Sequence, residues 1–223
     1  GVANMCKAAL VKLGVDFSKA KVAVQGFGNV GSFTALYLHK LGAKVVCVSD
    51  IYHTVYNEDG LDIPRMFEEV KKTKFVANNG YGVEISKEEF FALPIDAIVP
   101  CALENQITAE NAGSIRAKVV CEGANGPTTP EADEILHKNG VFLVPDILAN
   151  SGGVTVSYFE WVQNLQHYSW SFEHVQQQQE LLMNKAFDEI CKLSEEYDVD
   201  MRTAAYMMSI HRIDQVMKLR GWY

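Results

Sequence analysis

Apolar residues form two alternating patterns along the first two thirds of the chain, namely short continuous runs and stretches with helical spacing. The runs are rich in β-branched residues and predict buried strands, whereas the spaced stretches predict helices with one buried face. Six strands are expected, at residues 21–25, 43–48, 75–85, 97–99, 118–121 and 141–144. The third is predicted as an edge strand or ribbon that Asn78-Asn79-Gly80 interrupts, and residues 51–60 are predicted as a loop.

The stretches between these runs predict helices at residues 2–13, 30–41, 108–114 and 129–139. Two more helix starts are marked by Asp62 with Pro64 and by the capping-box spacing of Ser86 and Glu89. Strands that alternate with helices imply a mostly parallel, doubly wound α/β sheet with helices on both faces, the Rossmann type. We expect the strand order 3-2-1-4-5-6, numbered along the chain, with right-handed crossovers.

From Asp146 onward the pattern is helical throughout. Three segments are expected, at residues 146–166, 171–197 and 200–220. Residues 1–223 are therefore interpreted as one dinucleotide-binding domain that carries a helical tail over residues 146–223. Three long helices exceed what the sheet needs for cover, so some of them are expected to pack against something else.

A glycine-rich turn follows the first strand directly, with the sequence Gly26-Phe27-Gly28-Asn29-Val30-Gly31. The first glycine allows a tight turn, the second lets the backbone approach a pyrophosphate, and the third lets helix and strand pack closely. Asp50, followed by Ile51, lies just past the second strand, where a carboxylate can accept hydrogen bonds from a ribose diol. This combination predicts a dinucleotide site. The alternative interpretation of Asp50 is that it only caps the following turn.

In a parallel sheet the ligand lies at the carboxyl ends of the strands, so the residues just after each strand are candidates. Cys101 and Ala102 follow the fourth strand, Asn125 the fifth and Asn150 the sixth. Small and amide residues at these positions favour a bound nicotinamide arm. Each of them alone is also ordinary turn chemistry.

Composition narrows the function classes. The net charge of −8, from 20 basic and 28 acidic residues, argues against nucleic acid as a partner. No apolar run approaches the roughly 18 residues of a membrane span, and there is no signal-peptide pattern. The five cysteines lack C-x-x-C spacing and are interpreted as reduced core residues of a cytoplasmic protein. No residue spacing suggests a metal site.

Two long segments, residues 119–133 and 145–161, resemble the signature of glutamate dehydrogenases, and the glycine turn and residues 202–206 and 218–222 fit the same family. The resemblance implies oxidative deamination of L-glutamate to 2-oxoglutarate and ammonia, NAD as cofactor and a homohexamer. It also implies cofactor roles for the glycine turn, Asp50, Asn125 and Asn150. Val154 and Ser157 match positions that line the pocket for the substrate side chain. Their alternatives are a core residue for Val154 and, for Ser157, a helix hydroxyl bonded to its own turn.

Members of that family carry their catalytic lysine and aspartate on an amino-terminal substrate domain, and no corresponding glycine-flanked lysine motif exists here. The chain is therefore expected to be an isolated cofactor domain that holds no catalytic residue and binds NAD without turnover. Two alternatives remain open. One is a dehydrogenase for leucine or phenylalanine, and the side chains at positions 154 and 157 decide between it and a glutamate dehydrogenase. The other is a regulatory Rossmann module that senses a nucleotide without chemistry.

Asp50 also bears on cofactor choice, because the 2′-phosphate of NADP would meet like charge beside it. The next three residues, Ile51, Tyr52 and His53, include no permanent cation. His53 can carry a positive charge below about pH 6.5 and soften the repulsion. NAD is therefore expected to bind more tightly than NADP.

Overall fold

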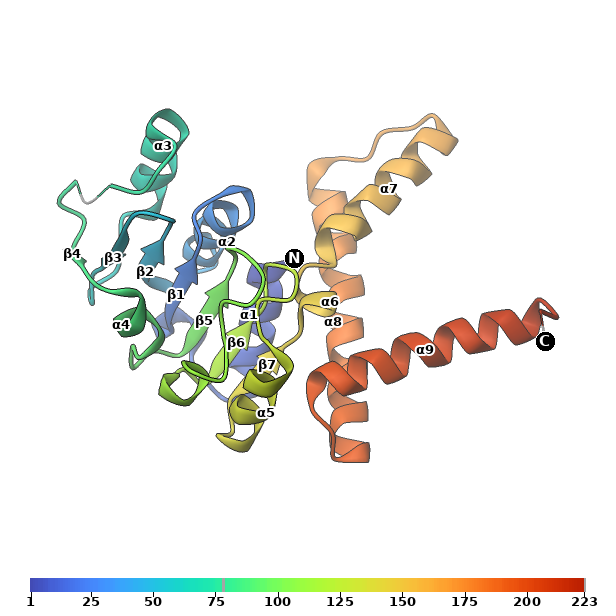
Figure 1. Ribbon diagram of the computed structural model, residues 1–223. Helices are drawn as coiled ribbons and strands as arrows, with labels where there is room; N and C mark the ends of the chain where they lie inside the picture. Colours follow the sequence, from blue (N-terminus) through green and yellow to red (C-terminus); the bar gives the residue numbers. More distant parts are fainter. Residues whose placement is uncertain (78, 223) are drawn as a thin grey trace.

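A seven-stranded sheet forms the centre of the computed structural model, which describes residues 1–77 and 79–222. Its strand order is β4-β3-β2-β1-β5-β6-β7 (Figure 1). The five strands β2, β1, β5, β6 and β7 run parallel to one another. At the other edge, β3 is antiparallel to β2 and β4 is antiparallel to β3. The strands are β1 (Lys21–Gln25), β2 (Lys44–Ser49), β3 (Thr54–Tyr56), β4 (Val83–Glu84), β5 (Ala97–Pro100), β6 (Val119–Cys121) and β7 (Phe142–Val144).

The prediction of a doubly wound, mostly parallel sheet is confirmed, and its five parallel strands have the expected order. The prediction was wrong at the antiparallel edge. Thr54–Tyr56, expected in a loop, form β3, and the expected edge strand narrows to Val83–Glu84, which pairs with β3 instead of β2. A strand of three residues offers too few alternating positions for a sequence pattern to reveal it. Of the predicted interruption, Asn78 lies outside the described residues.

Helices cover both faces of the sheet, because successive residues of each strand point to opposite sides. Val22 and Val24 join a core with α1 and α2, whereas Ala23 joins a second core with α4 and α5. The helices of this part are α1 (Val2–Lys12), α2 (Asn29–Lys40), α3 (Ile63–Thr73), α4 (Lys87–Phe91) and α5 (Pro130–Lys138), with short 3₁₀ turns η1 (Phe17–Lys19) and η2 (Ala112–Ser114).

Side-chain caps fix where several helices begin. Ser86 and Glu89 form the expected capping box at α4, and Asp62 accepts a hydrogen bond from the Arg65 amide at the start of α3. The short helix expected at residues 108–114 is reduced to η2. Ile107 pairs with Thr128 as an isolated parallel bridge, and residues 109–111 form turns between this bridge and η2.

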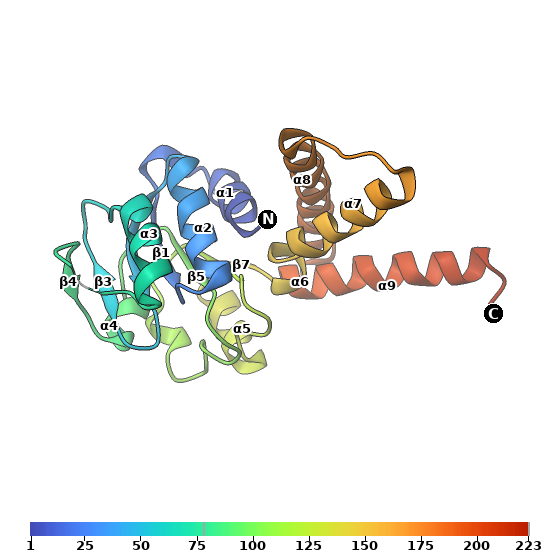
Figure 2. The same ribbon diagram turned by 90° about the horizontal axis from the view of Figure 1, so that it is seen from above.

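The helical tail consists of α6 (Asp146–Ala149), α7 (Gly152–Gln166), α8 (Phe172–Tyr197) and α9 (Met201–Leu219). The single helix expected at residues 146–166 breaks between α6 and α7. Met183 and Phe187 of α8 enter the main core beside α1, so α8 is anchored to the body. By contrast, α7 and most of α9 extend away from the body (Figures 1 and 2). Their exposed apolar residues include Val154, Tyr158, Trp161, Leu165, Tyr206, Ile210, Ile213, Val216 and Leu219.

None of the helices among the described residues has both the length and the apolar character needed to cross a membrane. The expectation that some of the tail helices pack against something else stays a prediction.

Candidate functional site

The glycine turn (residues 26–31) is shaped by close backbone approaches. Gly26 has φ +86°, and a Cβ atom on it would lie 2.8 Å from both the amide nitrogen and the Cα of Ala102. A Cβ on Gly31 would lie 1.7 Å from the carbonyl oxygen of Gly26. A Cβ on Gly28, in contrast, meets nothing within 4 Å. The first and third glycines are therefore required by packing, while the second leaves an open space beside the backbone.

Helix α2 begins at this open space. Gly28 is its N-cap and supplies no side-chain hydrogen bond to the first turn. The first backbone N–H groups, at Asn29 and Val30, thus face the turn without a side-chain acceptor, and they carry the positive end of the helix dipole. Phe27 is buried in the main core and anchors the turn. The arrangement suits a phosphate group.

The loops after β5 and β6 close against the glycine turn. The Cys101 amide donates a hydrogen bond of 2.7 Å to the Gln25 carbonyl oxygen, and the Gly123 and Ala124 amides each donate one of 2.9 Å to Pro100. A Cβ on Gly123 would lie 2.5 Å from the Cys101 sulfur, so these loops are in direct contact. The structure therefore brings Cys101 and Ala102 to the turn.

Burial raises the pKa of the Cys101 thiol to about 12, which keeps it protonated at neutral pH and unreactive. All five cysteines are buried and unpaired, so the expectation of reduced core residues is confirmed. Among the described residues no cluster of His, Cys, Asp or Glu side chains could hold a metal ion.

Asn125 and Asn150 come from different loops and meet side by side. The side-chain nitrogen Nδ2 of Asn150 donates a hydrogen bond of 2.7 Å to the side-chain oxygen Oδ1 of Asn125. Asn125 lies in the loop after β6, and Asn150 is the C-cap of α6. Each amide keeps further hydrogen-bonding groups for a ligand, because one contact uses only a part of the capacity of either side chain.

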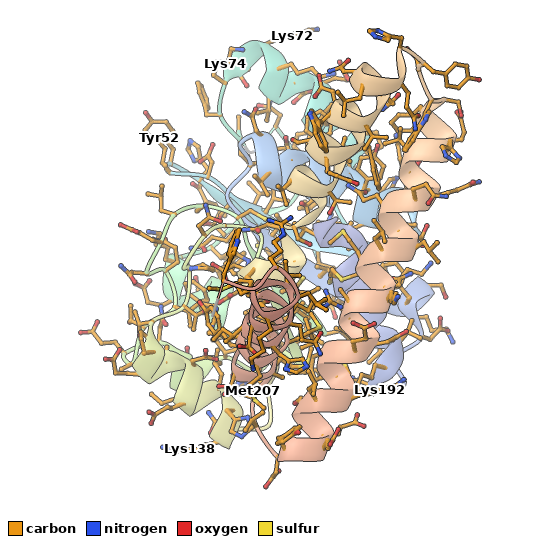
Figure 3. All side chains as sticks on the ribbon, turned by 90° about the vertical axis from the view of Figure 1, so that its right-hand side faces the viewer. Tyr52, Lys72, Lys74, Lys138, Lys192 and Met207 are labelled. Atoms are coloured by element: carbon orange, nitrogen blue, oxygen red, sulfur yellow. The ribbon has the colours of Figure 1, made fainter. Side chains whose placement is uncertain are left out.

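Asp50 is held by backbone amides. One carboxylate oxygen accepts hydrogen bonds of 2.8 Å from the amides of Tyr52 and His53, and the other accepts one of 2.5 Å from Val76. Asp50 thus caps the following turn, as the alternative interpretation held. A carboxylate has about four acceptor positions, so one position remains for a ribose hydroxyl. Ile51 is 82% exposed, and the Tyr52 side chain points outward (Figure 3).

A second carboxylate stands beside this loop and was missed by sequence reasoning. The His53 ring nitrogen Nδ1 lies 2.6 Å from a carboxylate oxygen of Glu84 on β4. A positive charge on His53 would therefore be paired within the protein instead of being free for a phosphate. A two-residue strand gives no periodic signal, so the sequence offered no way to place Glu84 there.

Behind the two asparagines lies a network of one arginine and three carboxylates, which was also missed. Each nitrogen of the Arg202 guanidinium contacts a different acid, with Nη2 2.8 Å from Glu122, Nε 2.5 Å from Asp133 and Nη1 3.2 Å from Asp146. The Glu122 side chain is fully buried. Its burial raises its pKa, which the hydrogen bond from Arg202 opposes. Burial acts to lower the pKa of Arg202, but its bonds to Glu122 and Asp133 outweigh this and raise it.

The two residues predicted to line the substrate pocket lie on α7, away from the glycine turn. Val154 is 70% exposed and is not a core residue, so that alternative was wrong. The Ser157 hydroxyl donates to the Gly153 carbonyl oxygen at 3.2 Å, as its alternative interpretation held. A role for either residue with a substrate stays a prediction.

The comparisons with known proteins agree over the whole chain. Residues 1–221 match the family model described as glutamate/leucine/phenylalanine/valine dehydrogenase. The chain is 55% identical over 228 residues to the NAD-specific glutamate dehydrogenase of Clostridioides difficile, covering all of this chain and 54% of that protein. It is 51% identical to the glutamate dehydrogenase of Thermotoga maritima, again over all of this chain and 54% of the relative. The chain thus spans about half the length of the curated relatives it matches.

Solved structures give the same fold. The hetero-hexameric glutamate dehydrogenase of Thermus thermophilus, in a leucine-bound form, superposes with a TM-score of 0.90 at 32% identity, over 100% of this chain and 54% of that one. The glutamate dehydrogenase of Peptoniphilus asaccharolyticus does so with a TM-score of 0.84 at 41% identity, over 100% and 53%.

Proposed function

We propose that this chain, which belongs to the glutamate/leucine/phenylalanine/valine dehydrogenase family, is the NAD-binding part of a glutamate dehydrogenase. The whole protein would convert L-glutamate to 2-oxoglutarate and ammonia. Residues 1–223 would form the cofactor domain, with the helical tail of residues 146–223, and the catalytic acid–base residues would lie on a substrate domain elsewhere in the protein. Relatives named as NAD-specific glutamate dehydrogenases, of which this chain spans about half, support this proposal.

The observation that carries the proposal is the open space at Gly28, framed by the first turn of α2 and by the loops after β5 and β6. The pyrophosphate of NAD would bind there to backbone N–H groups. The adenosine ribose would face Asp50 and Ile51. The nicotinamide end would lie toward Cys101, Ala102, Asn125 and Asn150. Bound NAD would supply the acceptor for a hydride from the α-carbon of the amino acid.

The residues of this chain would contribute positioning and would not take part in bond breaking. The amide pair of Asn125 and Asn150 would orient the nicotinamide through hydrogen bonds. Phe27 closes the underside of the turn and excludes water there. Val154 and Ser157 would form one wall of the substrate pocket, and the polar Ser157 favours glutamate over leucine or phenylalanine as substrate.

Three wider features belong to the same proposal. A homohexamer would fit the exposed apolar faces of α7 and α9, and the Thermus thermophilus neighbour is described as hetero-hexameric. A cytoplasmic location would fit five unpaired cysteines. A preference for NAD over NADP would follow from two carboxylates near the ribose side, Asp50 and the Glu84 that pairs His53.

A fluorescence titration with NADH and NADPH, run in parallel at pH 8, tests the proposal. NADH should bind at least about tenfold more tightly, a difference of about 1.4 kcal/mol. Addition of L-glutamate and NAD to the chain alone should form no NADH, because the acid–base residues would lie elsewhere. Absence of NADH binding would refute the proposed function, and equal affinities would refute the cofactor choice. Glutamate-dependent NADH formation would show that this chain carries its own catalytic residues.

A further inference from the structure

Arg202 stands at the start of α9, in the tail, yet it reaches three elements at the carboxyl edge of the sheet. Its partners are Glu122 directly after β6, Asp133 on α5 and Asp146 at the first position of α6. These residues are 80, 69 and 56 positions away along the chain. The guanidinium is therefore a long-range tie between α9 and these three elements.

Asp146 connects Arg202 to the backbone beside the two asparagines. The carboxylate oxygen that Arg202 does not contact accepts a hydrogen bond of 2.8 Å from the Gly126 amide, next to Asn125. The Asp146 carbonyl oxygen accepts the amide of Asn150 at 3.0 Å, and the Asp146 amide donates to Glu122 at 2.8 Å. Asp146 is therefore bonded to the neighbour of one asparagine, to the backbone of the other, and to Arg202 and its partner Glu122.

We propose that Arg202 is a positioning residue that holds Asn125 and Asn150 in the arrangement that receives the nicotinamide end of NAD. The inference rests on the proposed function, because it gives these amides a ligand. Arg202 itself touches neither asparagine. It acts through Asp146: without the guanidinium, this carboxylate would keep only its hydrogen bonds from the Gly126 and Ile147 amides, and its hold on the loop before α6 would loosen.

The adenosine side provides an internal reference, because the hydrogen bonds that Asp50 accepts from described residues come from the amides of Tyr52, His53 and Val76, none of which belongs to this network. Loss of Arg202 should therefore weaken the hold on the nicotinamide and leave the hold on the adenosine and pyrophosphate intact. NADH and ADP-ribose separate the two, since ADP-ribose lacks the nicotinamide. A general loss of structure would weaken both ligands together.

The experiment compares the two ligands on the wild-type chain and on Arg202→Met. For wild type, NADH should bind more tightly than ADP-ribose and should show enhanced nicotinamide fluorescence. For Arg202→Met, NADH affinity should fall about tenfold and the fluorescence enhancement should be lost, with ADP-ribose affinity within about twofold of wild type. Arg212→Met is the matched control. Arg212 lies on the same helix in an exposed pair with Glu189, and its loss should change neither ligand.

Removal of Arg202 alone leaves the buried Glu122 carboxylate without its cation and can unfold the chain. The double variant Glu122→Gln with Arg202→Met removes both charges and should fold, yet it still lacks the tie to Asp146. It should show the same selective loss of NADH affinity. Arg202→Lys, which keeps the charge but reaches fewer acids at once, should restore part of the NADH affinity.

Each outcome decides one question. If wild type binds no NADH, the proposed function fails. If wild type binds NADH and ADP-ribose equally, the asparagines give no hold on the nicotinamide and the inference fails while the function stands. If the folded double variant keeps the wild-type ratio of the two affinities, Arg202 is a structural tie without a positioning role.

Discussion

The two sides of the predicted cofactor site are held in opposite ways. On the adenosine side, Asp50 accepts hydrogen bonds from backbone amides 2, 3 and 26 positions away. On the nicotinamide side, Arg202 ties acids that lie 56, 69 and 80 positions away. The first side is built mostly from neighbouring residues, whereas the second forms only after the helical tail has packed onto the sheet.

Burial follows the same division. Ile51 and Tyr52 on the adenosine side are 82% and 68% exposed, so water screens charges there. Glu122 on the nicotinamide side is fully buried, so loss of its partner leaves an uncompensated charge in a medium of low polarity. Substitutions on the adenosine side should therefore change ligand preference, while those in the network should also threaten the fold.

The largest effect is expected for Gly31→Ala, which strikes the turn that both sides share. The new Cβ would lie 1.7 Å from the Gly26 carbonyl oxygen, so backbone must move. The free energy of unfolding should fall by at least about 3 kcal/mol, and NADH binding should be lost. Urea unfolding measures the first and a titration the second. Gly113→Ala, where a Cβ meets nothing within 4 Å, should cost far less. Similar stabilities of the two variants would contradict the packing argument.

Gly28→Val should abolish NADH binding without changing the structure of either side of the site. Gly28 has φ −79° and ψ −155°, an extended conformation outside the left-handed region that requires glycine, and its Cβ would enter open space. The free energy of unfolding should stay within about 0.5 kcal/mol of wild type. NADH affinity should fall at least about 100-fold, or about 2.8 kcal/mol, because the side chain fills the place of the pyrophosphate. Undiminished NADH binding would place the site elsewhere.

Asp50→Ser should affect the adenosine side alone. The affinity ratio of NADH to NADPH should drop from at least about tenfold to about twofold, because one negative charge near the 2′-phosphate is removed. Loss of the bonds to the Tyr52, His53 and Val76 amides should lower the free energy of unfolding by about 1–2 kcal/mol. Parallel titrations at pH 8 give the ratio. Asp59→Ser, at an exposed aspartate in a separate turn, serves as the control. An unchanged ratio would mean that Asp50 only caps its turn.

The smallest effect is expected for Ser157→Ala, which lies outside both sides. Within the described part of the chain, its hydroxyl donates to the Gly153 carbonyl oxygen of its own helix. The free energy of unfolding and the NADH affinity should both stay within about 0.5 kcal/mol of wild type. Thermal melting and an NADH titration are sufficient to check this. A clear loss of NADH affinity would show that α7 takes part in the cofactor site.

Local signals in the sequence predicted the parts of the molecule that depend on neighbouring residues. The glycine turn, the caps at Asp62 and Ser86, and the five parallel strands follow from spacing over a few positions. The pattern failed where an element is very short, as in β3 and β4, and where a break falls inside a helical pattern, as between α6 and α7. It also could not pair Arg202 with Glu122, because nothing in a sequence shows which charges meet when they lie 80 positions apart.

The two-residue edge strand β4 has a consequence for the behaviour of the protein at high concentration. An open sheet edge presents unpaired backbone groups to which a strand of another molecule can add, and such addition leads to aggregation. Here the edge is too short to template a long ladder, and the negatively charged Glu84 occupies half of it. At the β4 edge the sheet thus ends in a short, charged strand, which disfavours pairing with a strand of another molecule on that side.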